Sequence, residues 1–120
     1  MKRILVVDDS VTMRQLMKMV LMKHLPCQIT EAQDGLDALA KLKEGTFDLV
    51  VTDVNMPRMD GLGFVRAARE VLKSTVPIII VTTKGGEGDR DKGLQLGANA
   101  YLTKPINGIQ VVKTVNELLG

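Results

Sequence analysis

The sequence predicts an α/β fold in which a doubly wound sheet of five parallel strands is covered by helices on both faces. Short runs of Val, Ile and Leu alternate five times with longer segments of helical periodicity. Runs of four or five nearly continuous apolar residues are typical of strands that are buried on both faces. Strands that alternate with helices indicate parallel pairing through right-handed crossovers, and 120 residues are enough for one such domain.

Five apolar runs mark the expected strands. They cover residues 4–7, 28–32, 49–52, 78–81 and 100–102. The second run is more polar than the others, so we expect it at an edge of the sheet.

Five segments with apolar residues at three- and four-residue steps mark the expected helices. They cover residues 11–25, 36–42, 61–72, 87–96 and 109–119. In the first of them the apolar positions are Met13, Leu16, Met17, Val20 and Leu21. Asp34 and Asp60 precede the second and third helices and are expected N-caps. The fourth contains or follows four glycines, each of which costs about 1 kcal/mol in a helix interior, so we expect it to be short or mobile.

The composition excludes several classes of function. Apolar residues make up 45% of the chain and charged residues 25%, as in ordinary folded domains. A net charge of +2 is too small to indicate nucleic acid or a membrane surface as the main partner. Aromatic residues at 2% argue against stacking of bases or flavins, and the single cysteine, Cys27, suits a reducing cytoplasm. No apolar run approaches the roughly 18–20 residues of a membrane span.

Polar residues follow four of the expected strands at the point where each strand ends. They are Asp8 and Asp9, Asp53, Thr82, and Lys104. Because ligands bind beyond the carboxyl ends of parallel strands, these side chains are expected at one edge of the sheet. Three crowded carboxylates repel one another unless a cation joins them, and oxygen ligands suit Mg²⁺ or Mn²⁺ better than zinc. One carboxylate could then attack a phosphoryl group whose oxygens the ammonium and the hydroxyl bind.

In this order and spacing the residues resemble the receiver domain of response regulators. The resemblance rests on Asp8-Asp9, on Asp53 within Asp-Val-Asn-Met-Pro-Arg-Met-Asp-Gly, on Thr82 closing Ile-Ile-Ile-Val-Thr, and on Lys104-Pro105. It covers the whole chain and implies the CheY-like, flavodoxin-like strand order 2-1-3-4-5. It also implies one receiver domain over residues 1–120, without an output domain.

The resemblance implies a role for each site residue. Asp53 would accept a phosphoryl group from a histidine kinase. Asp9 and Asp53, with the backbone carbonyl of Asn55, would hold Mg²⁺, and Asp8 would help through water. Thr82 and Lys104 would then contact the phosphoryl oxygens.

Tyr101 stands at the position of the family's switch aromatic, whose rotamer reports the phosphorylation state. The output partner would bind the surface formed by the helix at 87–96, the strand at 100–102 and the helix at 109–119. Chemotaxis regulators of the CheY type are the most similar, which implies a flagellar switch as the output partner and a phosphatase as a further one. Such a chain catalyses only its own phosphorylation and dephosphorylation, as a monomer or a weak phosphorylation-dependent dimer.

Three further features concern the rates of phosphorylation and dephosphorylation and the geometry of one peptide bond. Thr83 stands where the family more often has Ala or Gly, and its larger side chain predicts slow labelling by small phosphoryl donors. Lys84 and Asn55 occupy positions that tune dephosphorylation in this family, and Lys84 could either reach toward the phosphate or be solvated. The Lys104-Pro105 bond is a candidate for a cis peptide, which is a minority choice for X-Pro bonds, and the sequence leaves cis or trans open.

Three alternatives remain open on the sequence. The chain could be a phosphohydrolase with an aspartyl nucleophile, as in the haloacid-dehalogenase type, although Asp8-Asp9-Ser10 departs from the Asp-x-Asp of those enzymes. It could be a flavodoxin-like electron carrier, although its first loop is anionic and tryptophan is absent. It could also be a receiver fold that is never phosphorylated and serves as a scaffold.

Overall fold

The predicted strand order is confirmed by the computed structural model, which describes residues 1–83 and 87–120. The five strands are parallel and lie in the order β2-β1-β3-β4-β5. Their bounds are β1 Lys2–Val7, β2 Cys27–Ala32, β3 Leu49–Thr52, β4 Ile78–Thr82 and β5 Ala100–Thr103. The helices are α1 Val11–His24, α2 Gly35–Glu44, α3 Gly61–Glu70, α4 Glu87–Leu96 and α5 Gly108–Leu119. The polar strand β2 lies at an edge, as expected.

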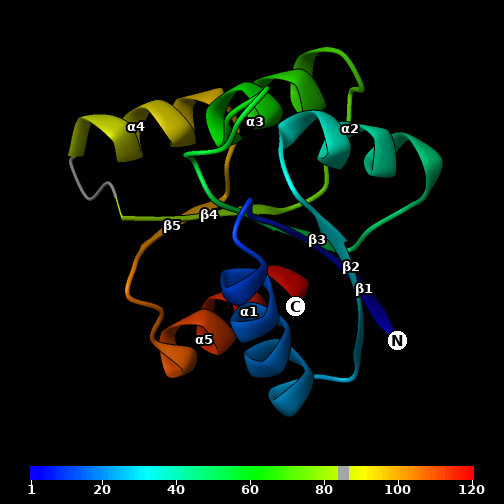
Figure 1. Ribbon diagram of the computed structural model, residues 1–120, viewed down its shortest axis with the longest axis vertical. Coiled ribbons are helices and arrows are strands. Elements are labelled where there is room, and N and C mark those ends of the chain that lie inside the picture. The colour runs from blue at the N-terminus through cyan, green and yellow to red at the C-terminus, as the bar shows by residue number, and fades with distance from the viewer. Residues whose placement is uncertain (84–86) are drawn as a thin grey trace.

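Helices cover both faces of the sheet (Figure 1), with α1 and α5 on one face and α2, α3 and α4 on the other. Alternate side chains of each strand therefore enter two separate cores. In β1, Leu5 and Val7 pack with Phe64 of α3, whereas Ile4 and Val6 pack with Leu21 of α1. Burial on both faces explains why residues 4–7 of β1 and all but the last residue of β3 and β4 are apolar.

The helix starts follow from their capping residues. The Asp34 carboxylate accepts a hydrogen bond from the Asp37 N–H at 2.8 Å, and Asp60 accepts one from the Gly63 N–H at 2.7 Å. Both predicted N-caps are therefore confirmed. In α1, Met17 and Leu21 are buried, but Leu16 is 38% exposed. Leu16 lies about 100° around the helix axis from Met17, which places it at the border of the apolar face.

The fourth helix has the predicted bounds, Glu87–Leu96, and with ten residues it is as long as α2 and α3, so it is not short despite its glycines. One of its glycines, Gly93, lies where the helix approaches the sheet. A Cβ atom there would come within 2.8 Å of the Ile80 side chain. This close approach gives the glycine a packing role that offsets its low helix propensity. Gly85 and Gly86, which precede this helix in the sequence, lie outside the described residues.

Another glycine, Gly61, brings α3 directly against the end of β3. A Cβ atom on Gly61 would lie 2.0 Å from the Asp53 carbonyl oxygen. The Gly61 N–H also donates to the Val54 carbonyl at 2.8 Å. The start of α3 is thus held against the residue that follows β3.

In the part of the chain that the structure describes, no helix is long and apolar enough to cross a bilayer.

We predict that Gly61→Ala lowers the free energy of unfolding by about 2 kcal/mol, because backbone must move to accommodate the added methyl group. Thermal unfolding followed by circular dichroism should show a midpoint lower by roughly 8 °C. Gly108→Ala is the matched control, since its Cβ would lie 3.7 Å from Val20 in ordinary contact. Equal midpoints for the two variants would contradict the close packing of α3 on Asp53.

Candidate functional site

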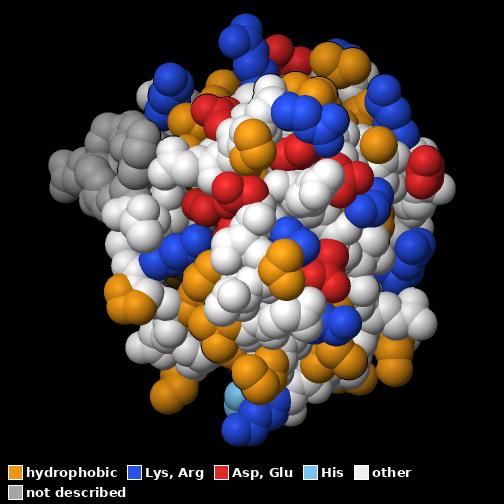
Figure 2. All heavy atoms as spheres, viewed as in Figure 1, with side chains coloured by type: hydrophobic (Ala, Val, Ile, Leu, Met, Phe, Trp, Pro, Cys, Tyr) orange, Lys and Arg blue, Asp and Glu red, His pale blue; other side chains and the backbone are white. Residues whose placement is uncertain are grey.

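Three carboxylates meet at the carboxyl edge of the sheet, as the sequence predicts. Asp8 and Asp9 follow β1 and Asp53 follows β3, and these strands are neighbours in the sheet. One carboxylate oxygen from each residue lies within 4.8 Å of the others. Asp8 and Asp53 are buried, whereas Asp9 is exposed. Acidic side chains gather near the centre of the face seen in Figure 2, above α1 in this view.

Lys104 brings a positive charge to this cluster from the end of β5. Its Nζ donates to Asp8 Oδ2 at 3.1 Å and to Asp53 Oδ2 at 3.2 Å. Burial disfavours the charged lysine, but the charges and hydrogen bonds of Asp53 and Asp8 outweigh this and raise the pKa of Lys104. The ammonium is therefore retained at neutral pH, between two buried carboxylates.

Backbone groups fix both buried carboxylates. Asp53 Oδ1 accepts from the Val54 N–H at 2.7 Å, and Asp8 Oδ1 accepts from the Ser10 N–H at 2.9 Å. Each carboxylate therefore accepts from a backbone N–H one or two residues ahead with one oxygen and from Lys104 with the other. These hydrogen bonds hold Asp8 and Asp53 in defined rotamers.

The donor set suits a hard divalent cation. Three carboxylates and one ammonium leave two negative charges uncompensated, and all the ligand atoms offered by the cluster are oxygens. Oxygen ligands around a site of this charge are what Mg²⁺ and Mn²⁺ prefer. Residues Asp8, Asp9 and Asp53 therefore fit the ion that the sequence analysis assigned to them.

Three other predicted site residues lie outside the cluster formed by the carboxylates and Lys104. Thr82 is buried at the end of β4, and its carbonyl accepts from the Lys104 N–H at 2.8 Å. Tyr101 is half-buried in β5, opposite Ile80 of β4, and packs against the core on the α3 face. Asn55 is exposed, two residues after Asp53.

The remaining expectations concern the Lys104-Pro105 bond, Thr83 and Lys84. The Lys104-Pro105 peptide bond, which the sequence left open, is cis. Thr83 is exposed directly after β4. Lys84, for which we expect a role in dephosphorylation, lies outside the described residues.

Two arginines make contacts around the site that could not be predicted from the sequence. Arg14 of α1 donates to the Asp8 carbonyl at 2.6 Å and to Glu31 of β2 at 3.1 Å. Arg58 donates through Nε to the buried carboxylate of Asp34 at 2.7 Å. The partners are 17 and 24 residues apart in sequence for the two side-chain pairs, and no local pattern signals such pairs.

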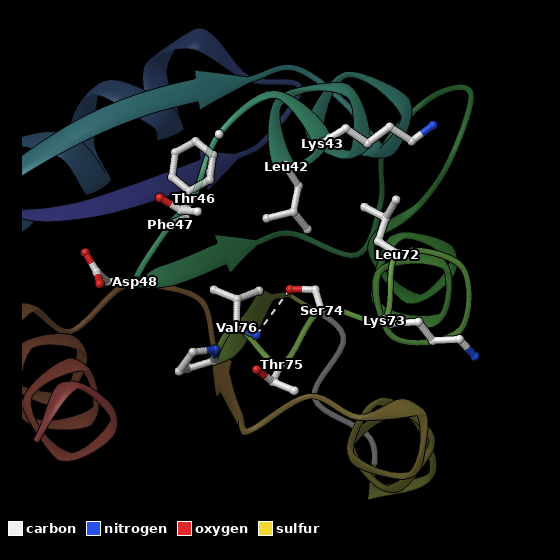
Figure 3. Close-up of a pocket in the computed structure, with 12 residues that line it drawn as sticks. Leu42, Lys43, Thr46, Phe47, Asp48, Leu72, Lys73, Ser74, Thr75 and Val76 are labelled. Atoms are coloured by element: carbon white, nitrogen blue, oxygen red, sulfur yellow. Dashed lines mark hydrogen bonds between the residues drawn. The ribbon is translucent and has the colours of Figure 1, made fainter.

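A cavity of about 710 Å³ lies at the opposite end of the sheet, where β3 and β4 begin. Figure 3 shows Leu42 and Val76 facing its interior, while the ends of Lys43 and Lys73 point outward. Lys43 lies in the last turn of α2, where its positive charge interacts favourably with the negative end of the helix dipole. None of the predicted site residues lines this cavity.

Relatives of known name support a signalling role for this geometry. The chain is 39% identical over 123 residues to protein PilH of Pseudomonas aeruginosa, a match that covers 99% of this chain and 98% of PilH. It is 40% identical over 117 residues to the transcriptional regulatory protein ResD of Bacillus subtilis, covering 98% of this chain. The chain spans only about half of ResD (48%) and 14% of a gliding motility regulatory protein of Myxococcus xanthus.

Solved structures agree with both the fold and the family. The chemotaxis protein CheY4 of Vibrio cholerae superposes with a TM-score of 0.90 at 35% identity, over 98% of each chain. The receiver domain of the Francisella response regulator 1452 superposes with a TM-score of 0.92 at 28% identity, covering 99% of this chain and 97% of that one. The family model for the response regulator receiver domain matches residues 4–116, so the chain belongs to this family.

Proposed function

We propose that the chain is a phosphorylation-activated switch in which Asp53 accepts a phosphoryl group from the phosphohistidine of a histidine kinase. A carboxylate oxygen of Asp53 attacks phosphorus, the P–N bond to the imidazole breaks, and a P–O bond forms. The leaving imidazole nitrogen takes up a proton. The chain would catalyse only this step and the later hydrolysis of its own acyl phosphate.

One observation carries the proposal: the Lys104 ammonium contacts Asp8 and Asp53 within a cluster of three carboxylates. Asp53 is the member that follows the central strand β3, with Asp8 and Lys104 on either side of it. The same ammonium that pairs with the carboxylate would neutralise charge on the transferred oxygens. Thr82, at the end of β4, would supply a hydroxyl to one of them.

The proposal includes a divalent ion, Mg²⁺ or Mn²⁺, for which the carboxylates of Asp9 and Asp53 and the backbone carbonyl of Asn55 are ligands. Asp8 would act through water. When bound, the ion supplies positive charge that reduces repulsion between the carboxylate and an incoming phosphoryl group. Support comes from the three carboxylate oxygens that already lie within 4.8 Å of one another.

Phosphorylation would change which protein the chain binds. New charge-assisted hydrogen bonds from Thr82 and Lys104 to the phosphoryl group would favour one conformer, and the rotamer of Tyr101 would follow. We assign the output partner to the face made by α4, β5 and α5. This face carries Ile109 of α5, which is 84% exposed, and the half-buried Tyr101 of β5.

Similarity to a chemotaxis protein, CheY4, and to PilH supports a chemotaxis-type pathway. The proposed partners are a histidine kinase, an output protein such as a flagellar switch, and a phosphatase. We place the chain in the cytoplasm, which suits the buried free thiol of Cys27. It would act as a monomer or as a weak dimer that forms on phosphorylation.

Incubation with Mg²⁺ and phosphoramidate, or with a phosphorylated kinase, should add one phosphoryl group to the chain. Intact-mass spectrometry should show this group to be base-labile and absent from Asp53→Asn, which removes the attacking oxygen. Asp48→Asn is the matched control, because Asp48 lines the cavity at the opposite end of the sheet. If no donor labels a chain that binds Mg²⁺, the scaffold alternative is favoured over the switch.

A second prediction concerns the residue that follows Thr82. Thr83→Ala should accelerate labelling by acetyl phosphate several-fold, because the smaller side chain widens access for a small donor. The rate is measured by intact mass against time, with Thr75→Ala as the control at the opposite end of the sheet. Unchanged labelling of Thr83→Ala would show that Thr83 does not limit access.

A further inference from the structure

We propose that the ion pair between Asp34 and Arg58 is a latch that positions the β3–α3 loop, residues 53–60, and thereby sets the affinity of the acidic site for Mg²⁺. The loop begins with Asp53 and contains Asn55, so its position determines where two of the proposed ligands lie. The latch rests on the proposed function only in taking Mg²⁺ as the ion of the site.

The pair joins two segments that are adjacent in space but not in sequence. Arg58 Nε donates to Asp34 Oδ2 at 2.7 Å, and the Asp34 side chain is only 3% exposed. The other oxygen, Oδ1, accepts from the Asp37 N–H at the start of α2. Asp34 is thus anchored to α2 by one oxygen and holds the loop with the other. Figure 1 shows α2 and α3 side by side above the sheet.

The backbone of Arg58 adopts a conformation that is unfavourable for arginine. Its φ angle is 63°, in the left-handed region that glycine or asparagine adopts at lower cost than arginine. Sparsely populated backbone angles persist where surrounding contacts impose them. Here the contact that an arginine adds, and a glycine could not, is the hydrogen bond to Asp34.

A second hydrogen bond joins the same two segments. The Gly35 N–H donates to the Met59 carbonyl at 2.9 Å, and a Cβ atom on Gly35 would lie 2.6 Å from that oxygen. The loop is therefore held to the start of α2 at two successive residues, by the side chain of Arg58 and the backbone of Met59.

The opposite end of the loop carries the site. Asp53 Oδ1 accepts from the Val54 N–H, and the Val54 carbonyl accepts from the Gly61 N–H that begins α3. The rotamer of Asp53 thus depends on the path of the loop, and the latch holds that path from the α2 side. Arg58 and Asp34 are positioning residues, since neither belongs to the carboxylate cluster.

Two variants separate positioning from long-range electrostatics. Arg58→Gly removes a positive charge and suits the left-handed backbone, whereas Asp34→Asn removes a negative charge and keeps an oxygen for the Asp37 N–H. Electrostatics alone predicts opposite effects, with Mg²⁺ bound more tightly by Arg58→Gly and less tightly by Asp34→Asn. The latch predicts weaker binding in both.

The test is isothermal titration of each full-length chain with MgCl₂, together with thermal unfolding to show that each variant is folded. We expect both variants to bind Mg²⁺ about tenfold more weakly than the wild type, as is typical when support behind metal ligands is lost. The double variant should lose little more than either single one, because one interaction is removed. Arg66→Ala is the control, since it breaks an exposed pair with Glu70 on α3.

Unchanged Mg²⁺ affinity in folded Arg58→Gly, or opposite shifts in the two variants, would overturn the latch. A wild type that binds no Mg²⁺ overturns both the latch and the metal site. A wild type that binds Mg²⁺ but accepts no phosphoryl group overturns the proposed function alone, and the affinities of the variants still decide the latch.

Discussion

The contact of the Lys104 ammonium with Asp8 and Asp53 is the interaction on which the site depends. Without a cation, two buried carboxylates at this edge of the sheet would repel each other and would be desolvated at a high cost. The three residues come from the ends of β5, β1 and β3, so the contact forms only when the parallel sheet is complete. The contact of Lys104 with the two carboxylates therefore depends on the sheet topology, and the close approach of the two buried carboxylates at this edge depends on the lysine charge.

The two cores hold these strand ends in place. Because β1 and β3 are buried on both faces, apolar packing from α1 and α5 on one side and from α2 and α3 on the other fixes their positions. The close contact of Gly61 with the Asp53 carbonyl adds a backbone constraint next to the proposed nucleophile. Rigid strands thus position the charged groups, which are the first residues of the loops that follow them, while the proposed ligand Asn55 lies further along one of these loops.

Much of the fold and the cluster could be predicted, because both follow from local patterns. Apolar runs mark the strands, and the residues after them must share an edge of a parallel sheet. The bounds of α4 follow from its pattern, but the packing role of Gly93 could not be predicted, because glycine propensity is a local quantity and this role arises from the approach of the helix to Ile80. The Asp34–Arg58 and Arg14–Glu31 pairs could not be predicted, since side-chain pairing across distant segments depends on tertiary geometry.

The most direct test of the account is the Mg²⁺ affinity of Lys104→Gln, measured by isothermal titration, with the exposed Lys113→Gln as a control for net charge. One unit charge a few Å from a divalent ion changes its binding free energy by on the order of 1–2 kcal/mol even in water. If the ammonium compensates the carboxylates in the absence of an ion, Lys104→Gln binds Mg²⁺ about tenfold more tightly than the wild type. Affinity that is unchanged or weaker, relative to the Lys113→Gln control, would contradict this account of the site.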